Sequence, residues 1–92
     1  MLGSVKLMEK SVSICKGLEP GQKIDLGQRI TSTGLILGID EVIRVKSGYL
    51  MSVRYLDCGY ACAWAYVSSE QLENAFELRP LTDGERQAYL SE

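Results

Sequence analysis

The chain has 92 residues, 46% of them hydrophobic, which is enough for one small core and too few for two ordinary domains. With only two prolines and many aliphatic side chains, the composition excludes a wholly disordered or collagen-like chain. The net charge is −2 and histidine is absent, which removes the commonest general base and a favoured zinc ligand. We therefore expect one domain over residues 1–92.

The cysteines and the uncharged stretches bear on the cellular compartment. Cys15, Cys58 and Cys62 make an odd number, which favours reduced thiols over a framework of disulfides. Charged residues interrupt the N-terminal stretch, so it lacks the apolar core of a signal peptide. The longest uncharged run, 58–69, has 12 residues, fewer than the roughly 20 that span a bilayer. We expect a cytoplasmic protein with no membrane segment.

Residues 1–10 are expected to be a disordered leader, with Met8 as an alternative start of the chain. Polar and apolar residues alternate through much of 11–80, which predicts strands. Ser11–Cys15 predicts the first of them, and Leu18–Gly21 has the proline and glycine of a turn. Further strands are expected at Lys23–Leu26, Gln28–Thr31, Leu35–Ile39, Glu41–Lys46, Tyr49–Tyr55 and Tyr60–Val67.

Helix signals come late in the chain. Ser68 followed by Gln71 is a capping box and predicts a short helical turn. Ala75–Arg79 is compatible with an extension of that helix or with a closing strand, and the alternation at Phe76 and Leu78 favours the strand, which ends before Pro80. Thr82-x-x-Glu85 is a second capping box, which predicts a C-terminal helix within residues 82–91.

From Gly21 to Pro80 the order of these elements is strand, apolar hairpin, tyrosine-bearing strand, tryptophan-bearing strand, helical turn and closing strand. The motifs that carry the pattern are Gly27-Gln28-Arg29-Ile30, Gly34-Leu35-Ile36-Leu37-Gly38-Ile39, Gly48-Tyr49-Leu50-Met51-Ser52-Val53, Trp64-Ala65-Tyr66 and Glu70-Gln71-Leu72-Glu73. This layout resembles small SH3-like barrels. The resemblance implies a mainly β fold, with a five- to six-stranded barrel over 11–80, a short helical turn and a C-terminal helix.

Within that architecture the layout is similar to the plasmid-borne, trimethoprim-insensitive dihydrofolate reductases. The strand before the last turn in that family carries Val-Gln-Ile-Tyr, whose Gln and Ile line the catalytic pore. The matching stretch here is Ala63-Trp64-Ala65-Tyr66, in which Tyr66 alone agrees and Trp64 replaces the Gln. Since an indole would block such a pore, the resemblance extends to the barrel and not to the activity.

No residue pattern predicts an enzyme. Cys58-x-x-x-Cys62 is the most site-like spacing, but zinc needs four ligands, and only Cys15 adds a third thiol. We interpret these cysteines as small buried hydrophobic residues. Serine and cysteine nucleophiles have no histidine base, so we expect no catalytic residue, no metal and no cofactor.

Aromatic residues crowd two consecutive predicted strands, and such clusters line binding grooves in SH3-like modules. The members of this aromatic cluster are Tyr49, Tyr55, Tyr60, Trp64 and Tyr66. The alternative is that Tyr49, Tyr55 and Trp64 fill the core and only Tyr60 is exposed.

Charge is unevenly distributed along the chain. Residues 1–56 carry eight Lys or Arg against five Asp or Glu, whereas residues 57–92 carry two against seven. Five of the late acids form a candidate binding surface for a basic or ribonucleoprotein partner. This acidic set is Glu70, Glu73, Glu77, Asp83 and Glu85. The first three have helical spacing, which is typical of a solvated helix face.

We therefore expect a non-enzymatic module that binds another macromolecule, with a protein as the expected partner. Small acidic proteins of this kind resemble phage or mobile-element accessory products that inhibit host complexes, such as anti-CRISPR proteins. One alternative is a barrel that binds nucleic acid through its aromatic residues and five cations. Those cations are Lys23, Arg29, Arg44, Lys46 and Arg54. A third possibility is a small-ligand site within a homo-oligomer of barrels.

Overall fold

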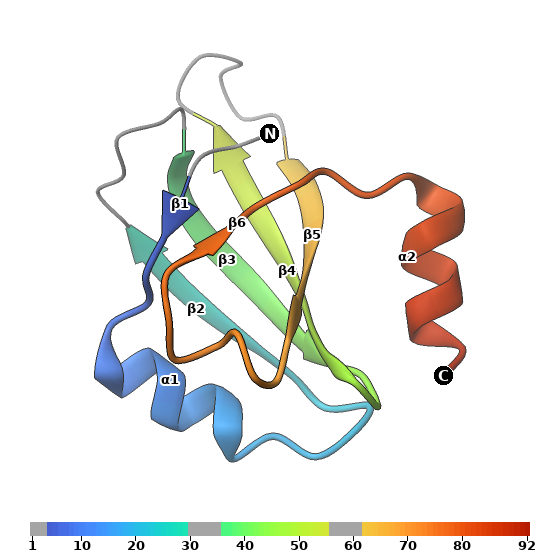
Figure 1. Cartoon of the computed structure of the whole chain (residues 1–92), viewed down its shortest axis with the longest axis horizontal. Helices are drawn as coiled ribbons and strands as arrows, with labels where there is room; N and C mark the ends of the chain where they lie inside the picture. Colours follow the sequence, from blue (N-terminus) through green and yellow to red (C-terminus); the bar gives the residue numbers. More distant parts are fainter. Residues whose placement is uncertain (1–3, 30–35, 56–61) are drawn as a thin grey trace.

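A computed structural model describes residues 4–29, 36–55 and 62–92 as an antiparallel sheet with other segments packed on it (Figure 1). The elements are β1 (Ser4–Val5), α1 (Glu9–Lys16), β2 (Lys23–Arg29), β3 (Ile36–Arg44), β4 (Gly48–Tyr55), β5 (Cys62–Ser68), β6 (Phe76–Glu77) and α2 (Asp83–Leu90). The main sheet has four strands in the order β2-β3-β4-β5, and β1 pairs separately with β6. Each strand of the main sheet thus pairs with its neighbour in the chain.

The strands of the main sheet follow the predicted pattern, with two pairs of short strands merged. The predicted strands on either side of Gly27 form the single strand β2, which accommodates Gly27 at φ 53° beside a register shift. The two runs around Asp40 likewise form β3, which bulges where Asp40 and Glu41 face Ser52 of β4. The Glu41 N–H donates to Ser52 Oγ at 3.0 Å, which gives this displaced backbone group a partner.

The mainly β architecture and the C-terminal helix are confirmed, but the four strands are not closed into a barrel. β2 and β5 are the two ends of the sheet, and β1 pairs with β6 in a ladder of two residue pairs. Among the described residues, β1 and β6 pair only with each other, and neither pairs with β2 or β5. On the β5 side, the Leu81 N–H donates to the Trp64 carbonyl at 2.8 Å, so the chain beyond β6 covers part of that edge.

The N-terminal region differs from the prediction. Ser11–Cys15, predicted as a strand, lies in α1, and Ser4–Val5 forms the strand β1 within the stretch expected to be disordered. Val5 and Leu7 are buried in the core, as is Cys15. The alternation in this stretch is compatible with a strand, but in a helix residues three or four apart share a face. In α1, Cys15 lies on the helix face that packs against the core.

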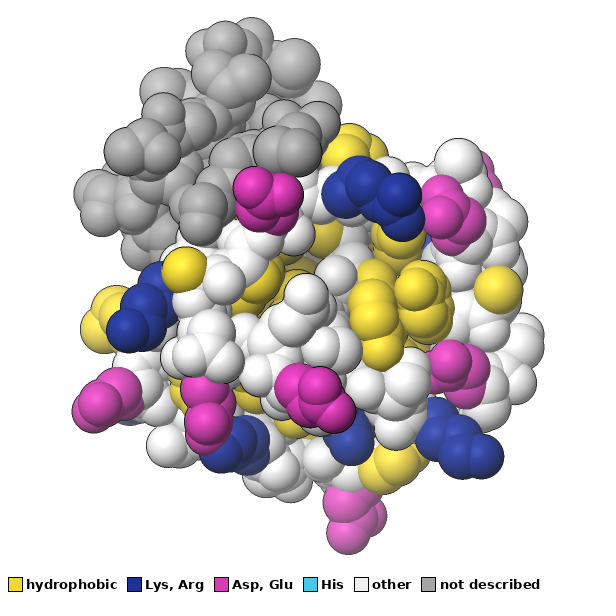
Figure 2. Space-filling view, in the orientation of Figure 1, with side chains coloured by type: hydrophobic (Ala, Val, Ile, Leu, Met, Phe, Trp, Pro, Cys, Tyr) yellow, Lys and Arg dark blue, Asp and Glu magenta, His cyan; other side chains and the backbone are white. Residues whose placement is uncertain are grey.

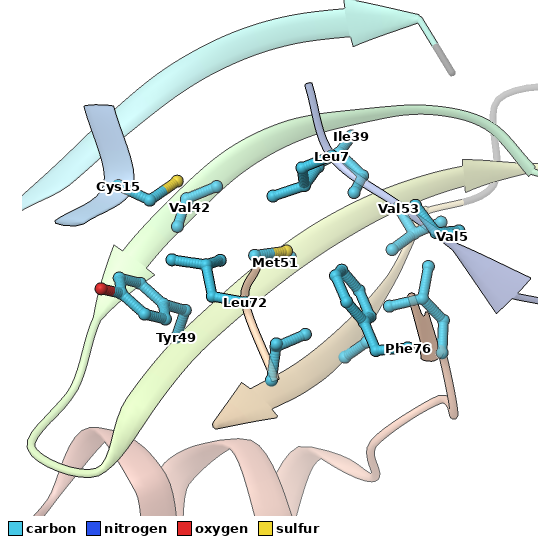
Figure 3. Close-up of a cluster of buried hydrophobic side chains, with 13 residues drawn as sticks. Val5, Leu7, Cys15, Ile39, Val42, Tyr49, Met51, Val53, Leu72 and Phe76 are labelled. Atoms are coloured by element: carbon cyan, nitrogen blue, oxygen red, sulfur yellow. The ribbon is translucent and has the colours of Figure 1, made fainter. Parts of the chain in front are cut away.

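The core lies on one face of the main sheet, which we call the inner face (Figure 3). Sheet residues Ile39, Val42, Met51 and Val53 are fully buried there. The opposing layer comes from β1, α1 and the segment between β5 and α2, which contribute Val5, Leu7, Cys15, Leu72, Phe76 and Leu78. The core therefore joins the N-terminal segment and the segment between β5 and α2 across the central strands.

The two predicted capping boxes are both present. Gln71 and Ser68 exchange backbone-to-side-chain hydrogen bonds, although the residues that follow form a turn and not a helix. Thr82 and Glu85 do the same at the start of α2, where the predicted helix is confirmed. The predicted closing strand is the two-residue β6.

Candidate binding surface

The predicted aromatic cluster is divided between the two faces of the sheet. Tyr49 is 3% exposed and belongs to the core on the inner face. Trp64 and Tyr66 are half-buried on the opposite, outer face, because they alternate along β5 with the core residues Ala65 and Val67. The alternative prediction is thus right for Tyr49 and wrong for Trp64. Tyr60 and the side chain of Tyr55 lie outside the described residues.

Helix α2 packs on the aromatic residues of the outer face. The rings of Tyr66 and Tyr89 stack with centroids 4.0 Å apart and planes 5° apart. The Arg86 guanidinium lies over the Trp64 ring, 5.5 Å from its centroid. Trp64 and Tyr66 therefore hold the protein's own helix, so they do not form the open aromatic groove that the sequence predicts.

A chain of hydrogen bonds fixes the end of α2 to the hairpin between β3 and β4. The Tyr66 hydroxyl donates to Ser47 Oγ at 2.7 Å, and Ser47 Oγ donates to Glu92 at 2.8 Å. The Ser47 N–H also donates to Glu92, at 3.2 Å. Gly48 follows at a point where a Cβ atom would lie 2.3 Å from the Val67 carbonyl oxygen, so no larger residue fits there without a shift of the backbone. Close approach of β4 and β5 thus depends on this glycine.

All members of the acidic set are exposed. Glu70 and Glu73 lie in the turn after β5 and Glu77 lies in β6, so the predicted helix face is wrong. Asp83 and Glu85 lie in the first turn of α2, where the helix dipole favours negative charge. Figure 2 shows acidic and basic side chains interspersed over the face it presents, so the acids there are not one continuous patch.

Some members of the acidic set have intramolecular partners. Glu73 forms an ion pair with Lys16 of α1. The Thr82 N–H and hydroxyl lower the pKa of the Glu85 carboxyl, with a smaller contribution from Arg79. The carboxylate of Asp83 is 99% exposed and lies 3.9 Å from Arg86, a distance at which solvent screens most of the attraction. Asp83 is thus the most accessible acid of those that form ion pairs.

Two of the five cations predicted for nucleic-acid binding are occupied within the fold. Arg54 Nε lies 2.6 Å from Asp40 Oδ2, and both side chains are about three-quarters buried. Arg44 donates to Ser69 Oγ at 2.8 Å and lies over the Tyr49 ring. Lys23 and Lys46 are exposed, and the side chain of Arg29 lies outside the described residues. The structure therefore brings together no row of free cations among those it describes.

Cys15 is the one cysteine whose side chain is described, and it is fully buried. Burial raises the pKa of its thiol to about 11, which keeps it protonated at neutral pH. A protonated, inaccessible thiol is a poor nucleophile and a poor metal ligand. Cys58 and the side chain of Cys62 lie outside the described residues, so the structure does not test the Cys58-x-x-x-Cys62 spacing as a site.

A groove that the sequence did not predict lies between α1 and the edge strand β2. Met8, Ile14, Ile24 and Leu26 supply its apolar lining, and its volume is about 340 Å³. It was hidden because Ser11–Cys15 resembled a strand. Glu9 and Lys16, which place opposite charges at the two ends of the segment as a helix prefers, are the signal that favours α1.

Neither a cluster of metal ligands nor a known relative indicates a function for the described part of the chain. Within residues 4–29, 36–55 and 62–92, no three Cys, Asp or Glu side chains gather as metal ligands would. None of the described helices has the length and apolar character needed to cross a bilayer. Comparison with protein-family models, curated proteins and solved structures finds no match for this chain. The function proposed below therefore depends on the contacts and charges of the chain itself.

Proposed function

We propose that the protein is a non-enzymatic binding module whose partner is a protein with a basic surface. The observation that supports this proposal is the contrast in how the fold treats its charges. The acidic set is exposed throughout, whereas two of the four predicted cations whose side chains are described, Arg44 and Arg54, are held by intramolecular contacts. Exposed charge is available to steer and orient a partner of opposite sign, and charge already paired is not.

Within the acidic set, Glu70 and Glu77 are the best-suited contact residues. Both are exposed, and neither forms an ion pair among the described residues. Their neighbour Glu73 is partly neutralised by Lys16. A partner that offers Arg or Lys side chains to this segment gains two unpaired carboxylates without breaking an existing contact. If that basic surface normally holds nucleic acid, binding here would exclude it, and the module would act as an inhibitor.

Affinity capture with matched variants tests this function. The immobilised protein is exposed to a nuclease-treated bacterial lysate, and the retained proteins are identified and eluted with salt. We expect Glu70→Lys/Glu77→Lys to weaken retention of basic proteins by about tenfold, since two attractive exposed contacts become repulsive. The control Glu9→Lys/Glu19→Lys makes the same change in net charge on α1 and the following loop, and should retain the same proteins.

Two results would count against the proposal. The first is equal loss of retention in both double variants, which would mean that net charge and not this surface governs capture. The second is a salt-dependent shift of a labelled DNA or RNA oligonucleotide at physiological ionic strength that Lys23→Glu/Lys46→Glu abolishes. That outcome would favour the nucleic-acid function instead.

A further inference from the structure

The outer edge of β2 is an open strand edge. In the main sheet β2 pairs with β3 on one side, and no described strand pairs with its other side. The strand is seven residues long, from Lys23 to Arg29. Such an edge presents backbone donors and acceptors in a row and is a template for pairing with another strand.

The backbone register shows which residues direct hydrogen-bonding groups to that edge. The Gly21 N–H donates to the Arg44 carbonyl and the Arg44 N–H donates to the Gln22 carbonyl, each at 2.8 Å, so Arg44 faces β2 with both groups. Since these directions alternate along antiparallel strands, Val42 also faces β2, and its partner Ile24 faces β3. Lys23 and Asp25, on either side of Ile24, therefore direct their N–H and C=O groups to the open edge.

We propose that this edge pairs with the same edge of a second copy of the chain, antiparallel and centred on Ile24. In that register Lys23 of each copy lies directly opposite Asp25 of the other. The N–H and C=O groups of Lys23 and Asp25 point to the open edge, so each of the two opposed pairs forms two backbone hydrogen bonds, four in all. The strand is thus self-complementary in charge and in hydrogen bonding, and the two sheets join into one.

The charges around Asp25 favour pairing with a second copy of the chain. Asp25 lies opposite Glu41 of β3, and like charges in that arrangement destabilise a sheet. Neither of these carboxylates forms an ion pair among the described residues, and neither does Lys23. Lys23 of a second copy would lie on the other side of Asp25 from Glu41 and offset the repulsion. Asp25 in turn would supply the partner that Lys23 lacks within its own chain.

The apolar side of the strand fits the same pairing. Ile24 and Leu26 are only half-buried, and they line the groove beside α1 together with Ile14 and Met8. Met8 is 60% exposed, the largest exposure of any large hydrophobic residue described. With Ile24 on the two-fold axis, Ile24 meets its own copy at a closely spaced pair, and the two grooves lie on the same side of the joined sheet. Association then covers apolar surface that the single chain leaves in water.

A charge-swap series tests the proposed register. Sedimentation equilibrium of the full chain, from micromolar to millimolar concentration, should show the mass rising from one chain towards two. Asp25→Lys should weaken association by about tenfold or more, because two attractive cross-strand pairs become repulsive. Lys23→Asp should do the same, and the double variant Lys23→Asp/Asp25→Lys should restore association. Glu19→Lys, with the same charge change as Asp25→Lys at another exposed position, should leave association unchanged.

The variants also separate association from folding. Asp25→Lys replaces a repulsive neighbour of Glu41 with an attractive one, so the monomer should be at least as stable to denaturant. A native chain that stays monomeric at millimolar concentration would overturn the proposal and leave the edge to a foreign strand. Association that the single reversals do not weaken, or that the swap fails to restore, would overturn it as well. The acidic set takes no part in this contact, so this result and the capture experiment stand independently.

Discussion

The two faces of the main sheet are covered in different ways. On the inner face, apolar side chains from the N-terminal segment and from the segment between β5 and α2 close over Ile39, Met51 and Val53, and these residues are fully buried. On the outer face, α2 packs through a stacked tyrosine pair, an arginine over an indole and hydrogen bonds to Glu92, and no residue of α2 is buried. Figure 1 shows α2 beside β5 at the margin of the fold.

This difference separates the core on the inner face, which stabilises the fold, from helix α2, which is attached to the outer face. Burial of apolar area is the dominant favourable term in folding, and most of the buried residues lie on the inner face, although Leu50 of β4 is fully buried on the outer face. Stacking and exposed polar contacts contribute about 1 kcal/mol each and are open to competition from solvent. We therefore expect the sheet and its inner cover to unfold as one unit, with α2 able to unfold locally at lower free energy.

The largest expected effect comes from the inner face. Met51→Ala removes a fully buried side chain from the central strand β4 and should lower the free energy of unfolding by about 3 kcal/mol. Leu90→Ala shortens a side chain of α2 that is 43% exposed. It should change the free energy of unfolding by about 0.5 kcal/mol or less. Urea denaturation followed by circular dichroism measures both. Similar losses in the two variants would contradict the division between the faces.

The buried thiol of the inner face gives the second effect. Burial raises the pKa of Cys15 from 9.0 to about 11, so its neutral form stabilises the folded state at every pH below 9. As the pH rises from 9 to 11, the thiol ionises in the unfolded chain first, and about 2 kcal/mol of stability should be lost.

Urea denaturation across that pH range measures the loss, with Cys15→Ala as the control. The alanine variant is less stable throughout because of the cavity it leaves. Other groups also titrate near pH 10, so the quantity to compare is the slope of stability against pH in the two proteins. Equal slopes would mean that Cys15 is not sealed in the core.

The smallest effect concerns the attachment of α2. Tyr89→Ala removes the ring that stacks on Tyr66 and should cost about 1 kcal/mol, whereas Tyr89→Phe keeps the stack and should cost little. Hydrogen exchange measures the consequence by region. We expect faster exchange of α2 amides in the alanine variant and unchanged exchange in β4. A parallel increase in both regions would show that α2 belongs to the same cooperative unit as the sheet.

Local sequence patterns predicted the central sheet well. β4 was expected because Tyr49, Met51 and Val53 recur at every second position with Arg54 on the other face, and the structure has it as a strand with those three side chains in the core. The start of α2 was expected from Thr82 and Glu85, whose reciprocal hydrogen bonds are formed within four residues. In both cases the deciding interactions are close along the chain.

The positions of the candidate binding residues were predicted less well from the sequence. The sequence put Tyr49, Trp64 and Tyr66 in one cluster because they are near one another in the chain. Their separation follows from strand register, since Tyr49 pairs with Val67 while Tyr66 pairs with Leu50, and neighbouring pairs point to opposite faces. The groove beside β2 could not be predicted, because it depends on α1 packing against a strand with which it shares no local pattern.

By itself, then, the sequence determined a small mainly β domain, the alternation of its central strands, the capped C-terminal helix and the excess of acid in its last third. Only the tertiary structure decided that Ser11–Cys15 is helical, that the sheet stays open at β2 and that α2 covers the outer aromatic residues. The physical reason is the range of the forces involved. Hydrogen-bonded caps and alternating side chains act within a few residues, whereas burial depends on which distant segments meet, as Leu7, Cys15 and Leu72 do over one face of the sheet.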